Sequence, residues 1–165
     1  MLVTDVTYAL DPESRVFWQH LGTAVLCGGL IGIERQLRGK AAGIRTSILI
    51  CLGTAVFVAL GASIDSAHVD PTRVVAQITS GIGFLGGGVI LARKGLITGV
   101  TTAAVIWVLA ALGALIGFGH LQATIVLTLA TLGILIGVEL LEGVFRRLQQ
   151  GATDRELDSI EIEQG

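Results

Sequence analysis

The stretch VVAQITSGIGFLGGGVILA, Val74 to Ala92, decides the fold, because it allows two incompatible interpretations. Gly81, Gly83 and Gly86 have the G-x-G-x-x-G spacing of a dinucleotide-binding turn. Such a turn needs a preceding strand, a following helix N-terminus and an acidic residue about 20 positions later. Here the glycines lie inside an apolar run, and no Asp or Glu follows them before Glu139. We therefore interpret them as part of a helix-packing surface.

The composition indicates a membrane protein. The 165 residues are 52% hydrophobic and 15% charged, with a mean hydropathy of +0.79, whereas soluble domains have about 25% charged residues. Cys27 and Cys51 are too few for a disulfide framework or a metal cluster. Apolar stretches that approach the ~20 residues needed to cross a bilayer are Val16–Ile33, Ser47–Ile64, Val74–Ala92, Gly99–Phe118 and Leu121–Leu141. We predict an all-α polytopic membrane protein with five transmembrane helices.

The distribution of cations predicts the orientation in the membrane. With the N-terminus outside, nine Lys and Arg residues fall on the inner side, and only Arg15 and Arg73 fall on the outer side. We expect an extracytoplasmic segment at 1–15, a transmembrane domain at 16–145 and a short polar cytoplasmic tail at 146–165. The first segment lacks the basic region of a cleaved signal peptide, so we expect it to remain on a protein of the bacterial inner membrane.

Glycines recur at four-residue spacing within the predicted helices, as expected where helix backbones pack closely in a membrane. Gly28 and Gly32 have this spacing in the first span, and Gly83 and Gly87 have it in the third. We predict that these four are helix-packing positions. The consecutive Gly86–Gly88 each lower helix propensity by about 1 kcal/mol relative to alanine, which leaves a kink or local unwinding open. The same spacing occurs at Gly113 and Gly117 and at Gly133 and Gly137.

The first two predicted helices resemble the next two in sequence. Gly28–Ser47 can be aligned with Gly87–Ala103, so that a Gly-Gly pair, a basic turn and G-[IV]-x-T recur. An internal duplication would point to a central site near the inner face. Chance similarity in so apolar a sequence is the alternative.

Polar and charged residues are most concentrated in the stretch IERQLRGKAAGIRTS, Ile33 to Ser47. Arg45 opens a predicted helix, where the macrodipole disfavours a cation, so it requires an acidic partner or an anion. One interpretation is a buried ion or ligand site at the inner face, formed by Glu34, Arg35, Arg45, Thr46, Thr101, Thr102 and Glu139. The alternative is a set of positive-inside anchors with an ordinary pair between Glu34 and Arg38.

The outer half offers a weaker polar cluster. His20, Gln77 and His68 could lie near Asp65 and Asp70, whose carboxylates are oxygen ligands of the kind that Mg²⁺ accepts. Two acids in a solvated loop are also explained by solubility alone. No metal site is assigned from this pattern.

The order of these motifs resembles the MgtC/SapB family of bacterial membrane proteins. The matching stretches are LIGIERQLRGKAAGIRTSILICLGTAVF (Leu30–Phe57), QITSGIGFLGGGVI (Gln77–Ile90) and GVTTAAVIWVLAALGALIGFG (Gly99–Gly119). The resemblance implies a five-helix inner-membrane protein linked to growth under Mg²⁺ limitation and, in pathogens, to intracellular survival, acting on membrane potential or ATP synthase. Longer members carry a soluble C-terminal domain, and this chain is expected to be a short member without it. The family's polar motif positions correspond here to Glu34, Arg35, Arg45, Thr46, Gln77, Ser80, Thr101 and Thr102.

Two functions of different classes follow. The first is a non-enzymatic membrane regulator whose glycine surfaces bind a partner helix. The second is a small ion or Mg²⁺ transporter or channel, expected to be dimeric because five helices enclose little, with its site at the cytoplasmic face. We expect no enzymatic activity, because no catalytic arrangement of Ser, His, Cys and acidic residues is visible in the sequence. We also expect no cofactor and no nucleic-acid partner.

Overall fold

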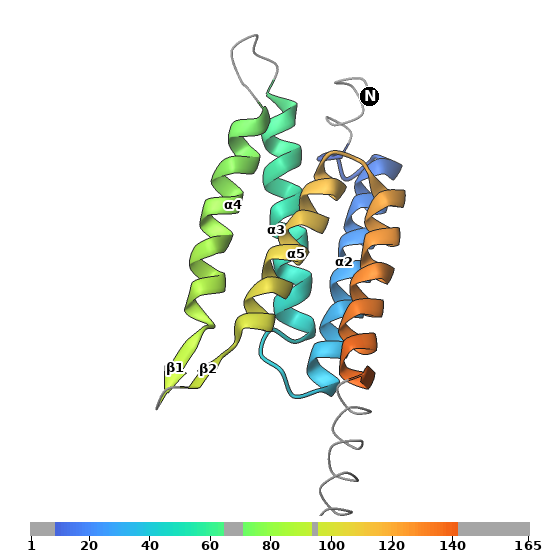
Figure 1. Ribbon diagram of the computed structural model, residues 1–165. Coiled ribbons are helices and arrows are strands. Elements are labelled where there is room, and N and C mark those ends of the chain that lie inside the picture. Colours follow the sequence, from blue (N-terminus) through green and yellow to red (C-terminus); the bar gives the residue numbers. More distant parts are fainter. Residues whose placement is uncertain (1–8, 65–70, 94–95, 142–165) are drawn as a thin grey trace, which may run out of the picture. The chain divides into compact units, whose positions relative to one another are not determined.

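The computed structural model describes residues 9–64, 71–93 and 96–141 (Figure 1). Contacts divide the chain into two compact units, Met1–Leu129 and Ala130–Gly165, and each unit is described by itself. The elements are α2 (Arg15–Leu37), α3 (Ile44–Ser63), α4 (Pro71–Gly88), β1 (Leu91–Arg93), β2 (Leu96–Thr98), α5 (Val100–Gly117) and a final helix, Leu121–Leu141.

Most described residues are helical, which agrees with the predicted all-α membrane fold. By length and composition, four of the described helices could cross a membrane: α2, α3, α5 and Leu121–Leu141. The bounds of the last helix agree with the predicted span. The third predicted span forms α4, which is a helix but is not among these four. It begins with Pro71, Thr72 and Arg73 and contains Gln77, and these residues lower its mean hydropathy.

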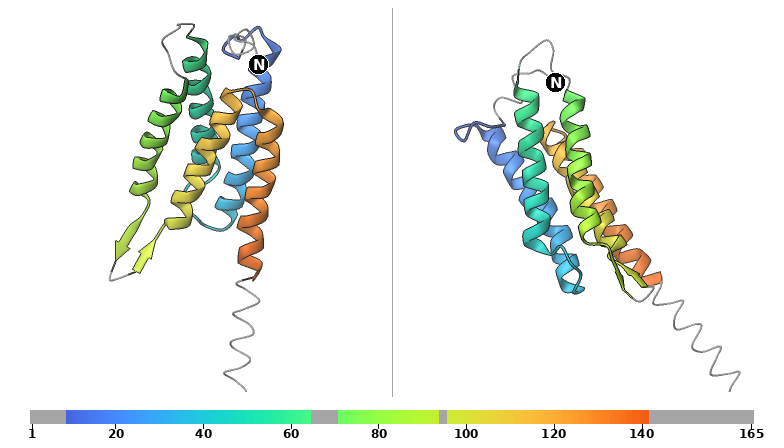
Figure 2. Two further views of the ribbon diagram at one scale, coloured as in Figure 1. Left: turned by 45° about the horizontal axis from the view of Figure 1, so that its top comes forward. Right: turned by 90° about the vertical axis from the view of Figure 1, so that its left-hand side faces the viewer.

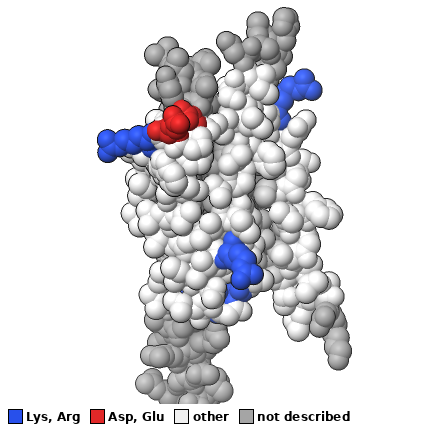
Figure 3. Space-filling model, turned by 180° about the vertical axis from the view of Figure 1, so that it is seen from behind, with Lys and Arg blue, Asp and Glu red and all other residues white. Residues whose placement is uncertain are grey.

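Helix α3 forms the centre of the first unit, because it packs extensively against both α2 and α5. Helix α4 packs mainly against α5 and has fewer contacts with α3 (Figures 1 and 2). Helices α2, α3 and α5 supply the buried apolar side chains Ile31, Cys51, Val58, Leu109 and Ile116. In the opposite view most of the surface is uncharged (Figure 3), as expected for helices that face lipid.

Close approach of the helix backbones depends on glycine at α2 and α5. A Cβ added at Gly32 would lie 2.5 Å from Ile44 Cα, and one at Gly28 would lie 2.8 Å from Ile48 Cα, both on α3. On the other side of α3, a Cβ added at Gly117 would lie 2.7 Å from the carbonyl oxygen of Ala55. Two glycine ridges therefore pack against α3, as membrane helices without a hydrophobic driving force require.

Two helices end in the same type of turn. In α5, Gly119 has φ +79°, its N–H donates to Ile116 O, and the N–H of His120 donates to Leu115 O. This is a Schellman motif, and it satisfies carbonyls that the helix end leaves open. Gly39, with φ +63°, ends α2 in the same way. Glycine is needed at both positions because other residues are strained at positive φ.

The connection between α4 and α5 was not predicted. The predicted continuation of the third helix to Ala92 is wrong, because α4 ends at Gly88 and a two-stranded antiparallel hairpin follows, with Ala92 opposite Ile97. The consecutive glycines form the last turn of α4, and the Val89 N–H still donates to Gly86 O. Their low helix propensity explains why the helix stops there, and the β-branched Ile97 and Thr98 favour the second strand of the hairpin.

Candidate functional site

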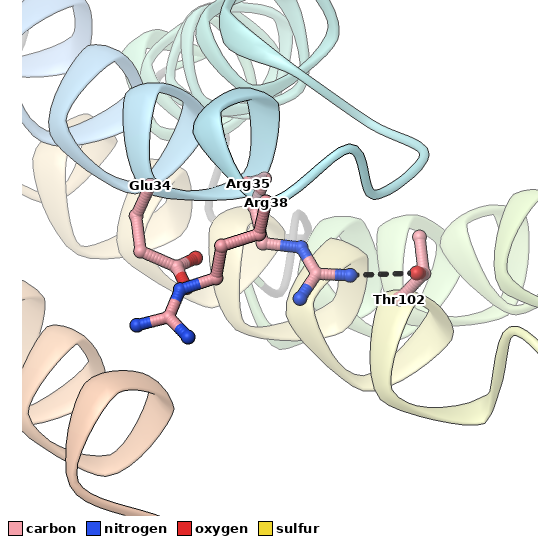
Figure 4. Close-up of polar contacts among 4 residues, drawn as sticks. All are labelled: Glu34, Arg35, Arg38 and Thr102. Carbon is pink, nitrogen blue, oxygen red and sulfur yellow. Dashed lines mark hydrogen bonds and ion pairs between the residues drawn. The ribbon is translucent and has the colours of Figure 1, made fainter. Parts of the chain in front are cut away.

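Two charged side chains are buried at the C-terminal end of α2. Glu34 is 8% exposed and Arg35 is 3% exposed. Arg35 Nη2 donates a hydrogen bond of 2.7 Å to Thr102 Oγ1 in the first turn of α5 (Figure 4). Thr102 is itself buried. A polar bond therefore joins α2 to α5 in the interior, where residues far apart in the sequence meet.

The neighbouring carboxylate has a partner on its own helix. Glu34 Oε1 forms an ion pair with Arg38 Nε, one turn further along α2. The acidic residue precedes the basic one by four positions, which is the favourable order along a helix. The pairing expected between Glu34 and Arg38 is thus confirmed, and Figure 4 shows both side chains beside Arg35.

Two buried polar atoms of this cluster lack hydrogen bonds among the described residues. They are Glu34 Oε2 and Arg35 Nε. Leaving a buried polar group unpaired costs about 1–3 kcal/mol, and more when the group is charged. A buried polar atom without a partner requires an explanation, and a functional role is one such explanation. We define Glu34, Arg35, Arg38 and Thr102 as the α2–α5 cluster.

The α2–α5 cluster carries two cations and one carboxylate. Among these four side chains the cations therefore outnumber the carboxylate by one. Charged side chains inside a membrane are costly and are functional by default. The cluster is the strongest candidate site in the part of the chain that the structure describes.

The other predicted site residues do not join this cluster. Arg45, Thr46 and Gln77 line a groove of about 650 Å³ between α3 and α4. We call it the α3–α4 groove. Arg45 is exposed there, and no ion pair links it to Glu34 among the described residues. The residues predicted to form one cluster therefore separate, with Glu34 and Arg35 in the α2–α5 cluster and Arg45 and Thr46 in the α3–α4 groove.

The remaining predicted positions are distributed over the surface. Ser80 and Thr101 are exposed in the first unit, and Glu139 is exposed in the second. A Cβ added at Gly83 or Gly87 would meet nothing within 4 Å, so neither position packs against another described helix. Of the weaker outer cluster, Asp65, His68 and Asp70 lie outside the described residues. Within the described ranges, no group of three or more His, Cys, Asp and Glu residues could hold a metal ion.

Sequence reasoning gave no functional role to two polar residues of this end. Arg38 belongs to the α2–α5 cluster, and its four-residue spacing from Glu34 was the available signal. Ser47 is fully buried, and its hydroxyl donates to Ala42 O over 3.2 Å. Ala42 has φ +60°, so this bond supports an unusual backbone conformation just before α3. The sequence carries no signal for that bond.

Comparison with known proteins relates residues 21–144 to the MgtC family. "Protein MgtC" of Brucella abortus (strain 2308) is 44% identical over 136 residues, which are 80% of this chain and 56% of the relative. "Protein MgtC" of Salmonella typhimurium (strain LT2) is 46% identical over 112 residues, or 65% of this chain and 47% of the relative.

A third relative has a different name. "Putative magnesium transporter YhiD" of Escherichia coli (strain K12) is 48% identical over 103 residues, which are 58% of this chain and 47% of the relative. The chain thus spans about half the length of the curated relatives it matches. No solved structure matches it at a significant level.

Proposed function

This chain belongs to the MgtC family, and on that basis we propose that it is a non-enzymatic protein of the bacterial inner membrane that serves adaptation to low Mg²⁺. Its multi-pass membrane character follows from the family and from the four apolar helices. The link to Mg²⁺ is supported by the name of the Escherichia coli relative.

The proposed topology has five spans, including α4, with the N-terminus outside and the C-terminus cytoplasmic. The α2–α3 connection and the β1–β2 hairpin lie at one end of the first unit (Figure 1). Arg38 and Lys40 belong to the first connection, and Arg35 and Arg45 lie in the helix turns beside it. Arg15 and Arg73 lie at the opposite helix ends. Grouping of cations at one end supports a cytoplasmic position for that end.

The protein is proposed to adjust the membrane potential by contact with a membrane partner, such as ATP synthase. One observation carries this proposal. Helix α4 packs on α5 through Gly86, near Ala103, while a Cβ added at Gly83 or Gly87 would meet no described residue within 4 Å. An uncovered small-residue ridge at four-residue spacing is the surface on which membrane helices associate. The same ridge would serve in a homodimer.

Leucine at both Gly83 and Gly87 is expected to weaken this contact without unfolding the protein. The added side chains enter open space in the chain itself, but they would separate the two helices at the interface. Overpacking of about 1.4 kcal/mol weakens an association about tenfold. We would measure growth at low Mg²⁺ and membrane potential in a bacterial strain that lacks the native gene and expresses the variant.

Gly22→Leu is the matched control, because Gly22 lies on α2 and also has nothing within 4 Å of an added Cβ. It should behave as the wild type. Normal growth and potential with the double variant would contradict the proposed role of the α4 ridge.

A second candidate function is an ion transporter with its site at the cytoplasmic face. The observation that favours it is the buried Glu34 carboxylate, of which Oε2 has no hydrogen-bond partner among the described residues. A buried carboxylate with an open oxygen can accept a proton or a cation in passage. The other oxygen of the same carboxylate already pairs with Arg38, which weakens its attraction for a cation, so this function ranks second.

Glu34→Gln separates the two functions. If the protein is a transporter, flux of Mg²⁺, K⁺ or protons into liposomes that contain only this protein should occur and should fall in this variant. Arg45→Ala is the control, because Arg45 lies outside the α2–α5 cluster, and it should keep the flux. The regulator proposed above should show no flux for any of the three ions, so flux that is lost in Glu34→Gln would replace the first proposal by the second.

A further inference from the structure

The α3–α4 groove is apolar along most of its length and has a cation at one end. Arg45 and Thr46 stand at the N-terminal end of α3, and Leu49 and Phe57 follow on the same helix. Leu49 is 61% exposed and Phe57 is 63% exposed. Helix α4 supplies apolar residues such as Leu85 to the opposite wall, and the only other polar lining residues are Thr54 and Gln77. Large apolar side chains thus line an open groove that leads away from a cation.

The cation is in an unfavourable position without an anion. Arg45 lies in the first turn of α3, where the helix dipole repels positive charge. The N-cap is Gly43, which has no side chain of its own to accept from the first N–H groups. The Ile44 N–H donates instead to Gln36 Oε1 over 3.4 Å. No acidic residue pairs with Arg45 among the described residues. A phosphate at this end would meet the Arg45 guanidinium, the Thr46 hydroxyl and the N-terminal end of the α3 dipole, a combination that binds anions.

The dimensions of the groove match one leaflet of a bilayer. Arg45 and Phe57 are twelve positions apart on α3, which corresponds to about 18 Å of helix. Half of the hydrocarbon core is about 15 Å thick. An anion at Arg45 at the membrane surface would therefore place Phe57 near the bilayer centre.

We propose that the α3–α4 groove binds an anionic phospholipid, with its phosphate at Arg45 and Thr46 and one acyl chain along the apolar walls. The apolar part and the cation are both required, because a free anion would use only one end and a neutral apolar molecule only the other. The opening toward the hydrocarbon, shown by the exposure of Leu49 and Phe57, gives a lipid direct access. This inference does not depend on either function proposed above.

The test uses the full chain, purified in a neutral detergent and titrated with phosphatidylglycerol or with phosphatidylcholine of the same acyl chains. Native mass spectrometry counts the bound lipids and the number of chains in each complex. We expect phosphatidylglycerol to bind about fivefold more tightly, which corresponds to ~1 kcal/mol for one cation near a membrane surface. Arg45→Gln should remove this preference, whereas Arg73→Gln, an exposed cation outside the groove, should retain it.

A second pair of variants tests the apolar walls. Gly53 and Gly81 line the groove, and an added Cβ at either would meet nothing within 4 Å. Leucine at either position should fill the groove and lower the binding of both lipids while the chain stays folded. Gly22→Leu is the control for a leucine at an open helix position elsewhere.

Four results would overturn the proposal. The first is equal binding of the two lipids, or no binding of either, to the wild type. The second is a lipid preference that persists in Arg45→Gln. The third is lipid binding that neither leucine variant in the groove changes, because the preference for phosphatidylglycerol would then come from surface charge alone. The fourth is displacement of phosphatidylglycerol by inorganic phosphate alone, or lipid-free dimers that are lost with Gly81→Leu, because a free anion or a second copy would then occupy the groove.

Discussion

Replacement of Gly113 by valine is expected to destabilise the protein by about 3 kcal/mol. A Cβ at this position on α5 would meet the carbonyl oxygen of Cys51 and would lie 2.8 Å from the Cβ of Thr54, both on α3. Backbone cannot rotate away as a side chain can, so the two helices would have to separate. Thermal unfolding in detergent, followed by loss of helical circular dichroism, measures the change in stability.

Gly22→Val is the matched control for this experiment. It introduces the same β-branched residue in place of a helical glycine, with the same small gain in helix propensity, but into open space. We expect its midpoint to stay near that of the wild type. Equal stability of the two variants would mean that α3 and α5 do not approach as closely as the structure shows.

Arg35→Met should have a comparable effect for a different reason. The substitution retains an apolar stem but removes the buried guanidinium, so Thr102 loses its donor and Glu34 loses a neighbouring positive charge. A hydrogen bond made by a charged group contributes about 1.5–3 kcal/mol, and the Glu34 carboxylate keeps its ion pair with Arg38, so we expect a loss in that range. The same unfolding measurement in detergent applies.

Thr102→Val isolates the hydrogen bond from the rest of that effect. It leaves the guanidinium buried without its acceptor and should cost about 1–3 kcal/mol. The double variant should be less destabilised than the sum of the two single variants, because both remove the same bond. Strict additivity would show that the bond between Arg35 and Thr102 contributes nothing to stability.

The helices could be predicted from the sequence, whereas the connection after α4 could not. Long apolar runs and glycine spacing identify α2, α3, α5 and Leu121–Leu141 because both are local properties of a membrane helix. All four residues from Val89 to Ala92 are apolar. A short run of this kind has no period that separates a strand from the end of a helix.

The candidate site was only partly predictable, because its residues meet through tertiary packing. The sequence identifies Glu34, Arg35 and Arg45 as one group of neighbours in a polar stretch. Burial then separates them: Arg35 points inward to Thr102, whereas Arg45 lies in the open α3–α4 groove. Which face of α5 meets α2 decides this outcome, and no local pattern in the sequence determines that choice.

The position of α3 between two glycine ridges also orders the assembly of the protein during its synthesis. Chains fold from the N-terminus as they emerge, so α2 and α3 can form their close contact as a hairpin once both are inserted. The opposite side of α3, with Cys51 and Thr54, receives Gly113 only after α4 and the β1–β2 hairpin have been made. Until then, that side of α3 faces lipid or whatever insertion factor holds the nascent chain.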